Sequence, residues 1–234
     1  MKAGEVQKAI RAKASTKRAK SNAWYFKTGK GEYGYGDKFT GLTVPEQREI
    51  AKRFRELPLS EVKKLLVSAY HEDRFVALEI LVMQYGWVGE SERKQIAKFY
   101  LQNKAGANNW DLVDTSAPYI LGHYLFTNKS ERGVLMKLAG SKSLWDRRIA
   151  IVSTLYFIGQ KRFNETLEIA KILLKDKEDL IHKAVGWALR EVWKRDPGVA
   201  EAFLTHHKAA MSRTTLRYAI ERMSESKRKA FLAK

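Results

Sequence analysis

The stretch Arg74-Phe75-Val76-Ala77-Leu78 places a basic residue directly before an apolar run, and the sequence repeats this arrangement twice. Arg147-Arg148-Ile149-Ala150-Ile151 and His182-Lys183-Ala184-Val185 follow at separations of about one or two periods of roughly 36 residues, typical of helical-pair repeats. Asp111 and Asp114 fall near the missing period. No stretch alternates strongly enough to demand a sheet. The sequence therefore predicts an all-α, HEAT-like α-solenoid of stacked antiparallel helix pairs, with alternate helices lining a concave basic face.

The apolar spacing predicts a succession of helices from Pro45 onward, each roughly 10 to 18 residues long. Pro45 is expected at the first helical position of a helix that reaches Phe54, and Ser60 opens the next. The other expected helices run over 73–87, 90–103, 109–126, 130–139, 143–159, 163–175, 179–195, 198–208 and 212–232, with a candidate break near Ser224. Residues 1–234 are expected to form a single repeat domain, with a basic N-terminal helix or arm at 1–22 and a Gly- and Tyr-rich insertion or loop at 27–42.

The charge balance indicates a polyanionic partner. The 44 Lys and Arg residues against 26 Asp and Glu residues give a formal net charge of +18, far more than solubility requires. Nucleic acid is the leading partner and an anionic membrane surface follows. The basic run in the first twenty residues, with Val6 and Ile10 hinting at a weakly amphipathic helix, is either a solvated face or an arm that contacts phosphates.

Several classes of protein are disfavoured by composition. No apolar run approaches the length of a bilayer span, and no apolar core follows the Lys-rich start, so neither a membrane helix nor a signal peptide is expected and the predicted location is cytoplasmic. Zero cysteines exclude disulfides, thiol nucleophiles and Cys-based metal sites. The five histidines show no HExxH spacing, so neither a metal nor another cofactor is expected.

Residues 24–39 contain too many glycines for a helix and predict a loop or an irregular hairpin. A literal GxGxxG occurs at Gly29, Gly31 and Gly34, but no apolar strand precedes it and no helical pattern follows directly, which argues against a dinucleotide site. Glycines with interleaved lysines and tyrosines suit contact with a nucleic-acid backbone or bases. A purely structural loop is the alternative.

The stretch from Asn108 to Pro118 crowds aromatic, acidic and helix-disturbing residues together. On a helix, Trp110 and Asp114 stand one turn apart on the same face. Pro118 has no N–H for the carbonyl of Asp114, so the helix should bend or end near this carboxylate. A core tryptophan, a capping or ion-paired aspartate and a simple kink are the structural alternative.

The repeat pattern would bring further candidate residues to the same concave face. If alternate helices line that face, Arg147 or Arg148 from one pair and Lys183 with Trp187 from the next join Trp110 and Asp114. Lys183 and Trp187 are again four residues apart and project together. An arginine facing Asp114 would keep the carboxylate ionised and hold its rotamer.

The sequence resembles a known family, the bacterial AlkD-type DNA alkylation repair proteins, which are alkylpurine DNA glycosylases with HEAT-like repeats. Three motifs carry the resemblance, which extends from about Trp24 to beyond Trp193. They are Asn109-Trp110-Asp111-Leu112-Val113-Asp114 with Ser116-Ala117-Pro118, then Trp145-Asp146-Arg147-Arg148-Ile149-Ala150-Ile151, and Lys183-Ala184-Val185-Gly186-Trp187-Ala188-Leu189-Arg190-Glu191.

The resemblance implies hydrolysis of the N-glycosidic bond of N3- or N7-alkylated, cationic purines in duplex DNA. It implies that Asp114 matches the family's catalytic aspartate. Trp110 and Trp187 match the two tryptophans of the family's catalytic cleft, and Arg148 matches its cleft arginine, with a one-residue slip to Arg147 as the alternative. Tyr25 is the nearest match to an early aromatic residue that faces the DNA in the family. The other residues expected to contact DNA are Lys27, Lys30, Arg74, Arg147, Lys183 and Arg190.

Residues 29–39 depart from the family pattern, since this stretch is absent from the shorter glycosylases. Relatives with an insertion in this region resemble structure-specific DNA binders without glycosylase activity. A non-catalytic binder of branched or distorted DNA is therefore the alternative function. A helical scaffold for an acidic protein partner is a third hypothesis, which leaves Trp110, Asp114, Arg148 and Trp187 unexplained. A monomer is expected, because solenoids of this size commonly act alone and no heptad stripe is present.

Overall fold

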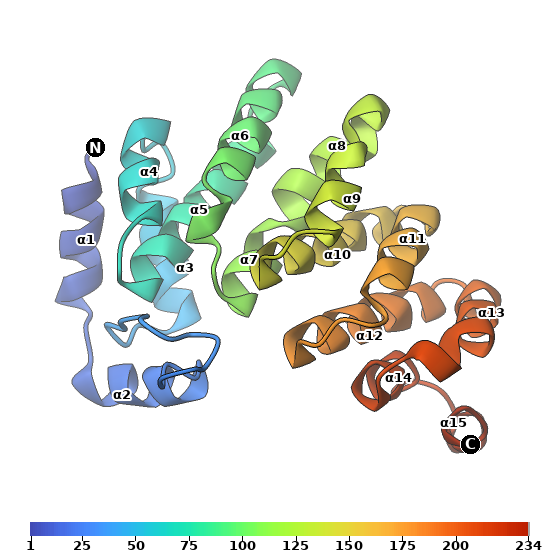
Figure 1. Cartoon of the computed structure of the whole chain (residues 1–234). Helices are drawn as coiled ribbons and strands as arrows, with labels where there is room; N and C mark the ends of the chain where they lie inside the picture. Colours follow the sequence, from blue (N-terminus) through green and yellow to red (C-terminus); the bar gives the residue numbers. More distant parts are fainter. Residues whose placement is uncertain (234) are drawn as a thin grey trace. The chain divides into compact units, whose positions relative to one another are not determined.

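The computed structural model describes residues 1–233, and these residues are predominantly helical (Figure 1). Apart from one isolated bridge between Lys38 and Tyr70, the described chain contains no β-structure. The prediction of an all-α fold is confirmed. The chain clusters into two compact units, Met1–Ser116 and Ala117–Lys234, whose boundary lies within the stretch 108–118.

Unit 1 is built around a long central helix, α5, which contacts α1, α3, α4, α6 and α7. Its residues 71–81 are all buried, so α5 forms the core of this unit. The helices of unit 1 are α1 (Ala3–Ala12), α2 (Thr16–Tyr25), α3 (Val44–Arg53), α4 (Leu59–Leu66), α5 (His71–Trp87), α6 (Glu90–Gln102), the 3-10 helix η1 (Lys104–Gly106) and α7 (Trp110–Ser116).

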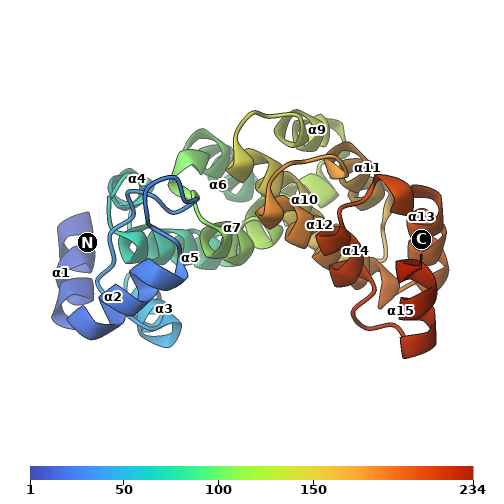
Figure 2. The same ribbon diagram turned by 60° about the horizontal axis from the view of Figure 1, so that its bottom comes forward.

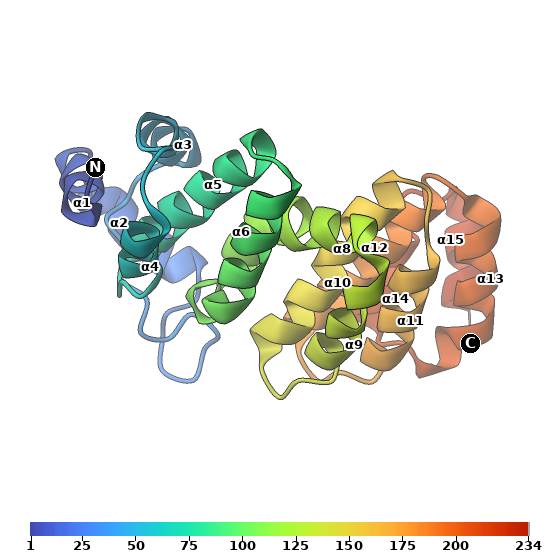
Figure 3. The ribbon, with the colours of Figure 1, turned by 90° about the horizontal axis from the view of Figure 1, so that it is seen from above.

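Unit 2 stacks its helices in the order expected of an α-solenoid, with α10 packed on α12 and α12 packed on α14 (Figure 3). The helices α9 and α11 pack on α10, and α13 packs on α12. The helices of unit 2 are η2 (Pro118–Gly122), α8 (His123–Thr127), η3 (Lys129–Glu131), α9 (Gly133–Ala139), α10 (Leu144–Gly159), α11 (Asn164–Leu173), α12 (Asp179–Trp193), α13 (Pro197–His207), η4 (Lys208–Ala210), α14 (Arg213–Ala219) and α15 (Glu225–Leu232).

Side-chain caps explain where several of these helices begin. Thr43 and Glu46 form a capping box at the start of α3, which begins one residue before Pro45 rather than at it. Ser143 caps α10. Ser224 accepts a hydrogen bond from the backbone of Lys227 and starts α15, so the candidate break in 212–232 is confirmed.

The basic N-terminal run differs from the single helix suggested by its pattern. It forms two helices, α1 and α2, because Ser15 caps a new helix by accepting a hydrogen bond from Arg18 N at 3.4 Å. The backbone N–H of Ser15 also donates to the carbonyl of Thr40 at 2.8 Å. Residues 27–42 form no helix, so the prediction of an irregular segment there is confirmed.

The single helix expected over 109–126 is wrong, because the chain changes its helical hydrogen bonding after Ser116. α7 ends there, and the π-helical segment η2 begins at the buried Pro118. The backbone N–H of Gly122 donates to the carbonyl of Ala117, five residues back, at 2.8 Å. Pro118 cannot donate a backbone hydrogen bond to Asp114, so the predicted interruption near this carboxylate is confirmed.

Candidate functional site

Trp110 and Asp114 lie one turn apart on α7, and both side chains are half-buried. The opposite side of α7 is covered, since Leu112 and Val113 are buried. The buried Asn109 precedes the helix and accepts a hydrogen bond from the backbone N–H of Trp110 through Oδ1 at 2.8 Å. Residues 110–116 thus form a short helix whose more accessible face carries an indole and a carboxylate.

The indole of Trp110 belongs to an aromatic cluster formed by Tyr25, Phe26, Phe39 and Trp110. Phe26 stacks on Trp110 with ring centroids 5.3 Å apart and on Phe39 with centroids 5.2 Å apart. Tyr25 meets the edge of Trp110 at 6.1 Å. Figure 2 shows α2 and the segment after it beside α5 and α7. The aromatic cluster therefore joins the end of α2, the Gly- and Tyr-rich segment and the start of α7.

His71 lies behind this cluster and connects two carboxylates. Its side chain is only 3% exposed, with Nδ1 at 3.1 Å from Asp37 Oδ2 and Nε2 at 2.8 Å from Asp111 Oδ2. Burial lowers its pKa, but the charge of Asp111 and hydrogen bonds to Asp111 and Asp37 outweigh burial and raise the pKa to about 9. His71 is therefore an imidazolium at neutral pH, donating through both nitrogens. Phe39 stacks on its ring at 4.7 Å.

Asp37 shares its second oxygen with Arg74, whose Nη2 donates to Oδ1 at 2.6 Å. Burial raises the pKa of Asp37, but hydrogen bonding to His71 and the charge of Arg74 outweigh burial and lower it. Arg74 is 3% exposed and also donates to the carbonyl of Ser68 at 2.7 Å. Arg74 therefore supports Asp37 from inside the protein. Its guanidinium is not exposed, as the predicted contact with DNA would require.

The segment 27–42 is anchored to the start of α5 by its backbone. Lys38 N donates to the carbonyl of Ala69 at 3.0 Å, and His71 N donates to the carbonyl of Lys38 at 2.8 Å. The buried carboxylate of Glu72 accepts hydrogen bonds from the backbone N–H groups of Thr40 and Gly41 at 2.9 and 2.8 Å. The insertion is therefore an integral part of unit 1 and supplies Asp37 and Phe39 to the candidate site.

The outer side of the same region exposes aromatic and basic side chains. Trp24 is 82% exposed, Tyr25 58% and Tyr35 67%. Lys27 and Lys30 are also exposed, and Lys27 has a positive φ of 52°. A surface pocket of about 550 Å³ is lined by Ala23, Trp24, Tyr25, Lys27, Thr28, Gly29 and Glu32. Tyr25, Lys27 and Lys30 are thus accessible, as their predicted contacts with DNA require.

Within unit 2, both arginines at the start of α10 are engaged by backbone carbonyls. Arg148 is 5% exposed and donates from Nη1 to the carbonyl of Leu180 at 2.7 Å. Arg147 pairs with Asp176, with Nε at 2.6 Å from Oδ2, and donates to the carbonyl of Ser141 at 3.0 Å. Each guanidinium therefore joins the start of α10 to neighbouring loops or helices of this unit.

The remaining predicted residues lie on α12. Trp187 is half-buried and stands one turn after Lys183. Lys183 Nζ lies 2.8 Å from Oδ2 of Asp179, one turn earlier. The hydrogen bond from Lys183 and the charge of Lys183 lower the pKa of Asp179. Arg190 forms an ion pair with Glu221. The three predicted residues of α12 thus follow one another at intervals of a helical turn.

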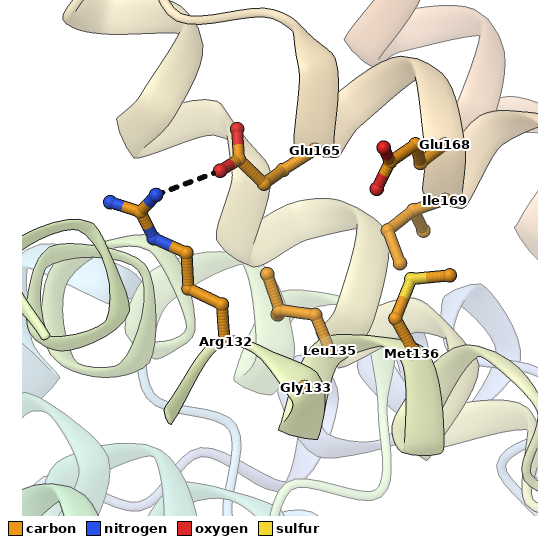
Figure 4. A pocket seen from close by; sticks show the side chains of 7 residues that line it. All are labelled: Arg132, Gly133, Leu135, Met136, Glu165, Glu168 and Ile169. Carbon is orange, nitrogen blue, oxygen red and sulfur yellow. Dashed lines mark hydrogen bonds and ion pairs between the residues drawn. The ribbon is translucent and has the colours of Figure 1, made fainter. Parts of the chain in front are cut away.

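Another pocket, of about 220 Å³, lies in unit 2 at α9 and α11. Arg132 points toward Glu165, and the Nη1 of Arg132 lies 3.0 Å from its Oε1 (Figure 4). None of the predicted site residues lines this pocket. Within residues 1–233, no group of three or more His, Asp or Glu side chains is arranged to hold a metal ion, and no helix is long and apolar enough to span a membrane.

Sequence reasoning missed the interior support of the candidate site. His71, Asp37, Phe26 and Phe39 were not singled out, although they surround Trp110 and Asp111. One signal was available: α5 begins with the four polar residues 71–74, directly before its apolar run. Four buried polar side chains in succession require partners from elsewhere in the chain.

The comparisons with known proteins agree with the sequence resemblance. No curated protein matches this chain. A solved structure described as a predicted DNA alkylation repair enzyme from Enterococcus faecalis is similar in fold, with a TM-score of 0.71 and 18% sequence identity over 91% of this chain and 97% of that chain. The family model for DNA alkylation repair enzymes matches residues 6–223, which span both units. The resemblance is thereby confirmed, and the chain belongs to the DNA alkylation repair enzyme family.

Proposed function

We propose that this protein is a DNA glycosylase that hydrolyses the N-glycosidic bond of N3- or N7-alkylated purines in duplex DNA. Family membership supports a role in DNA alkylation repair and implies DNA as the partner. The observation that supports glycosylase activity is that α7 carries a half-buried carboxylate, Asp114, one turn after the indole of Trp110. This pairing suits a reaction in which positive charge develops on a sugar.

The chemistry requires little from the protein beyond electrostatics. Alkylation makes the purine cationic, so the C1′–N bond can break with its electron pair moving to the base, which becomes neutral without a general acid. The sugar becomes oxocarbenium-like, and the oxygen of a water molecule forms the new bond to C1′. Asp114 stabilises this cation, orients the water and accepts its proton. The products are a neutral free base and an abasic site.

Trp110 is proposed to offer its π face to the cationic sugar or lesion. The stacking of Phe26 against this indole limits the orientations that it can adopt. Trp187 on α12 is assigned a similar aromatic role, and Arg148 on α10 is assigned the place of the family's cleft arginine. The assignments for Trp187 and Arg148 rest on the family resemblance.

The first test compares release of 7-methylguanine and 3-methyladenine from methylated duplex DNA by the wild type and by Asp114→Asn. The amide keeps the shape of the side chain but removes its charge, so we expect base release to fall about 100-fold or more while DNA affinity stays within about twofold. Glu90→Gln, an exposed acid at the start of α6, is the matched control and should release bases at the wild-type rate. Equal activity of Asp114→Asn and wild type would remove Asp114 from the centre of the mechanism.

The second candidate function is non-catalytic binding of branched or distorted DNA. The exposed Trp24 and Tyr35 beside Lys27 and Lys30 favour it, because exposed rings can stack on unpaired bases while lysines hold the backbone. A wild-type protein that releases no base, yet binds a branched duplex more tightly than a linear one, would support this alternative.

A further inference from the structure

The charged core behind Trp110 connects three segments that are far apart in the sequence. His71 opens α5, Asp37 lies in segment 27–42, and Asp111 is the second residue of α7. The two hydrogen bonds of the imidazole span 34 and 40 residues of chain. Asp111 directly follows Trp110 and stands three residues before Asp114. A group that holds Asp111 therefore holds the start of the helix that carries both proposed reactive side chains.

We propose that His71, held as an imidazolium between Asp37 and Asp111, is a positioning residue that fixes the start of α7 and thereby the orientation of Trp110 and Asp114. This inference rests on the proposed function, in which Trp110 and Asp114 act on the substrate. The Gly- and Tyr-rich insertion thereby gains a role inside the protein, because its Asp37 is one of the two carboxylates that hold His71.

The geometry requires the doubly protonated ring. A neutral imidazole has one N–H donor and one lone pair, whereas both nitrogens of His71 face carboxylate oxygens within 3.1 Å. Loss of the proton would leave a lone pair against a carboxylate and turn one attraction into a repulsion. The hydrogen bond to Asp37 or the one to Asp111 would then be lost, which would weaken the attachment of α7 to His71.

The charged groups around His71 come from each element packed against it. Asp37 comes from segment 27–42 and Asp111 from α7, while Arg74 lies one turn along α5 and neutralises part of the charge of Asp37. The next residues of α5 face other partners: Glu72 accepts from the backbone of Thr40 and Gly41, and Asp73 pairs with Arg11. Phe26 and Phe39 cover the ring and contribute no charge.

The same arrangement accounts for the protonation state at neutral pH. Burial alone would lower the pKa of His71, yet the two carboxylates raise it to about 9. Replacing Asp37 with asparagine removes one of these charges while leaving an amide oxygen that can still accept from Nδ1–H. Asp37→Asn should therefore lower the pKa of His71 toward the neutral range and leave the imidazole in place.

The test measures the pKa of His71 by NMR titration of protein labelled with 13C- and 15N-histidine. Hydrogen exchange, corrected for intrinsic rates, measures the protection of the backbone amides of α7. In the wild type we expect His71 to titrate near pH 9 and the protection of α7 to stay constant between pH 6 and 8. In Asp37→Asn the pKa should fall by at least about one unit, with the loss of α7 protection following the new pKa. His206→Gln, an exposed histidine of α13, is the control and should leave both unchanged.

Base release provides the second readout. In Asp37→Asn, kcat should fall about 10- to 100-fold as pH rises through the new pKa of His71, while KM changes by less than about threefold, because misorientation of a reactive group affects the chemical step. A His71 that titrates below about pH 7 in the wild type would overturn the proposal. A shifted His71 pKa with unchanged α7 protection and kcat would overturn it equally.

The two failures are distinguishable. If the wild type releases no base at any pH, the proposed glycosylase function fails, while the NMR titration and the α7 exchange still decide whether His71 fixes α7. If Asp37→Asn does not fold, the same measurements on the wild type from pH 7 to 10 and on Asp111→Asn serve instead. Loss of α7 protection that tracks the His71 titration in either protein supports the proposal, and constant protection through that titration overturns it.

Discussion

A buried histidine with two acidic partners is a stabilising group only while it is charged. In this protein His71 sits between Asp37 and Asp111, and Arg74 binds the far oxygen of Asp37. Removing one member of such a buried network leaves the others desolvated without compensation, which costs far more than an exposed ion pair gains. The residues that support Trp110 are therefore more sensitive to substitution than the exposed lysines around them.

The raised pKa of His71 predicts a specific dependence of stability on pH. His71 has a pKa of about 9 in the folded protein, against an ordinary value of 6.5, and this difference stabilises the folded state by about 3 kcal/mol. The stabilisation is fully present below pH 6.5 and is lost as the pH rises through about 9. Urea unfolding of the wild type between pH 6 and 9.5 should show this decline. In His71→Gln the decline should be absent, so the difference between the two proteins should shrink with rising pH. Parallel curves would contradict the assigned charge.

At the scale of elements, α5 is arranged so that its polar start meets partners from distant segments while its apolar length fills the core of unit 1. Glu72 and Asp73 lie in its first turn, where carboxylates are favoured by the helix dipole. Each also binds outside the helix, to the 27–42 backbone and to Arg11 respectively. This single element thereby holds α1, the insertion and α7.

Close approach of α12 and α14 depends on Gly186. A Cβ at this position would lie 2.4 Å from the Cβ of Tyr218 and 2.6 Å from the carbonyl of Thr215. Gly186→Ala should therefore separate the two helices and destabilise unit 2 by about 1–3 kcal/mol, despite the better helix propensity of alanine. Thermal or urea unfolding measures this change.

Gly159→Ala is the matched control, because it adds the same methyl group at the end of α10, where nothing lies within 4 Å. Its stability should equal or slightly exceed that of the wild type. Equal stabilities of the two variants would show that the α12 and α14 contact tolerates an added side chain.

At the scale of the whole molecule, the net charge of +18 dominates the interaction expected with DNA. Lysines and arginines that neutralise phosphates release condensed counterions, so affinity should fall steeply with salt. Much of the arginine charge is already engaged internally, as for Arg74, Arg147 and Arg190. Exposed lysines are therefore the better candidates for phosphate contacts.

The double variant Lys27→Gln/Lys30→Gln tests this expectation. The slope of log affinity against log salt concentration should become shallower by about 1–2, since each lost phosphate contact contributes roughly 0.9. The change should be similar for methylated and unmethylated duplexes. Lys98→Gln/Lys129→Gln, two exposed lysines on other surfaces, should leave the slope nearer to that of the wild type. An identical slope in both double variants would place the DNA elsewhere.

Local patterns in the sequence were sufficient to predict most of the helices, the irregular 27–42 segment and the interruption at Pro118, and three motifs carried the resemblance to the family. Apolar spacing and caps act over one or two turns, so they can be recognised without knowing what each helix packs against. The motif around Trp110 and Asp114 belongs to this class of information, as does the charge that indicates DNA.

Only the tertiary structure decided which polar groups meet. The contacts of His71 with Asp37 and Asp111, the burial of Arg74 and the stacking of Phe26 on Trp110 join positions far apart in the chain. Spacing along a sequence does not specify such pairings, because many acids and bases are available and burial selects among them. The physical reason is that a buried charge must find its partner in the folded core, whereas a helix needs only its own neighbours.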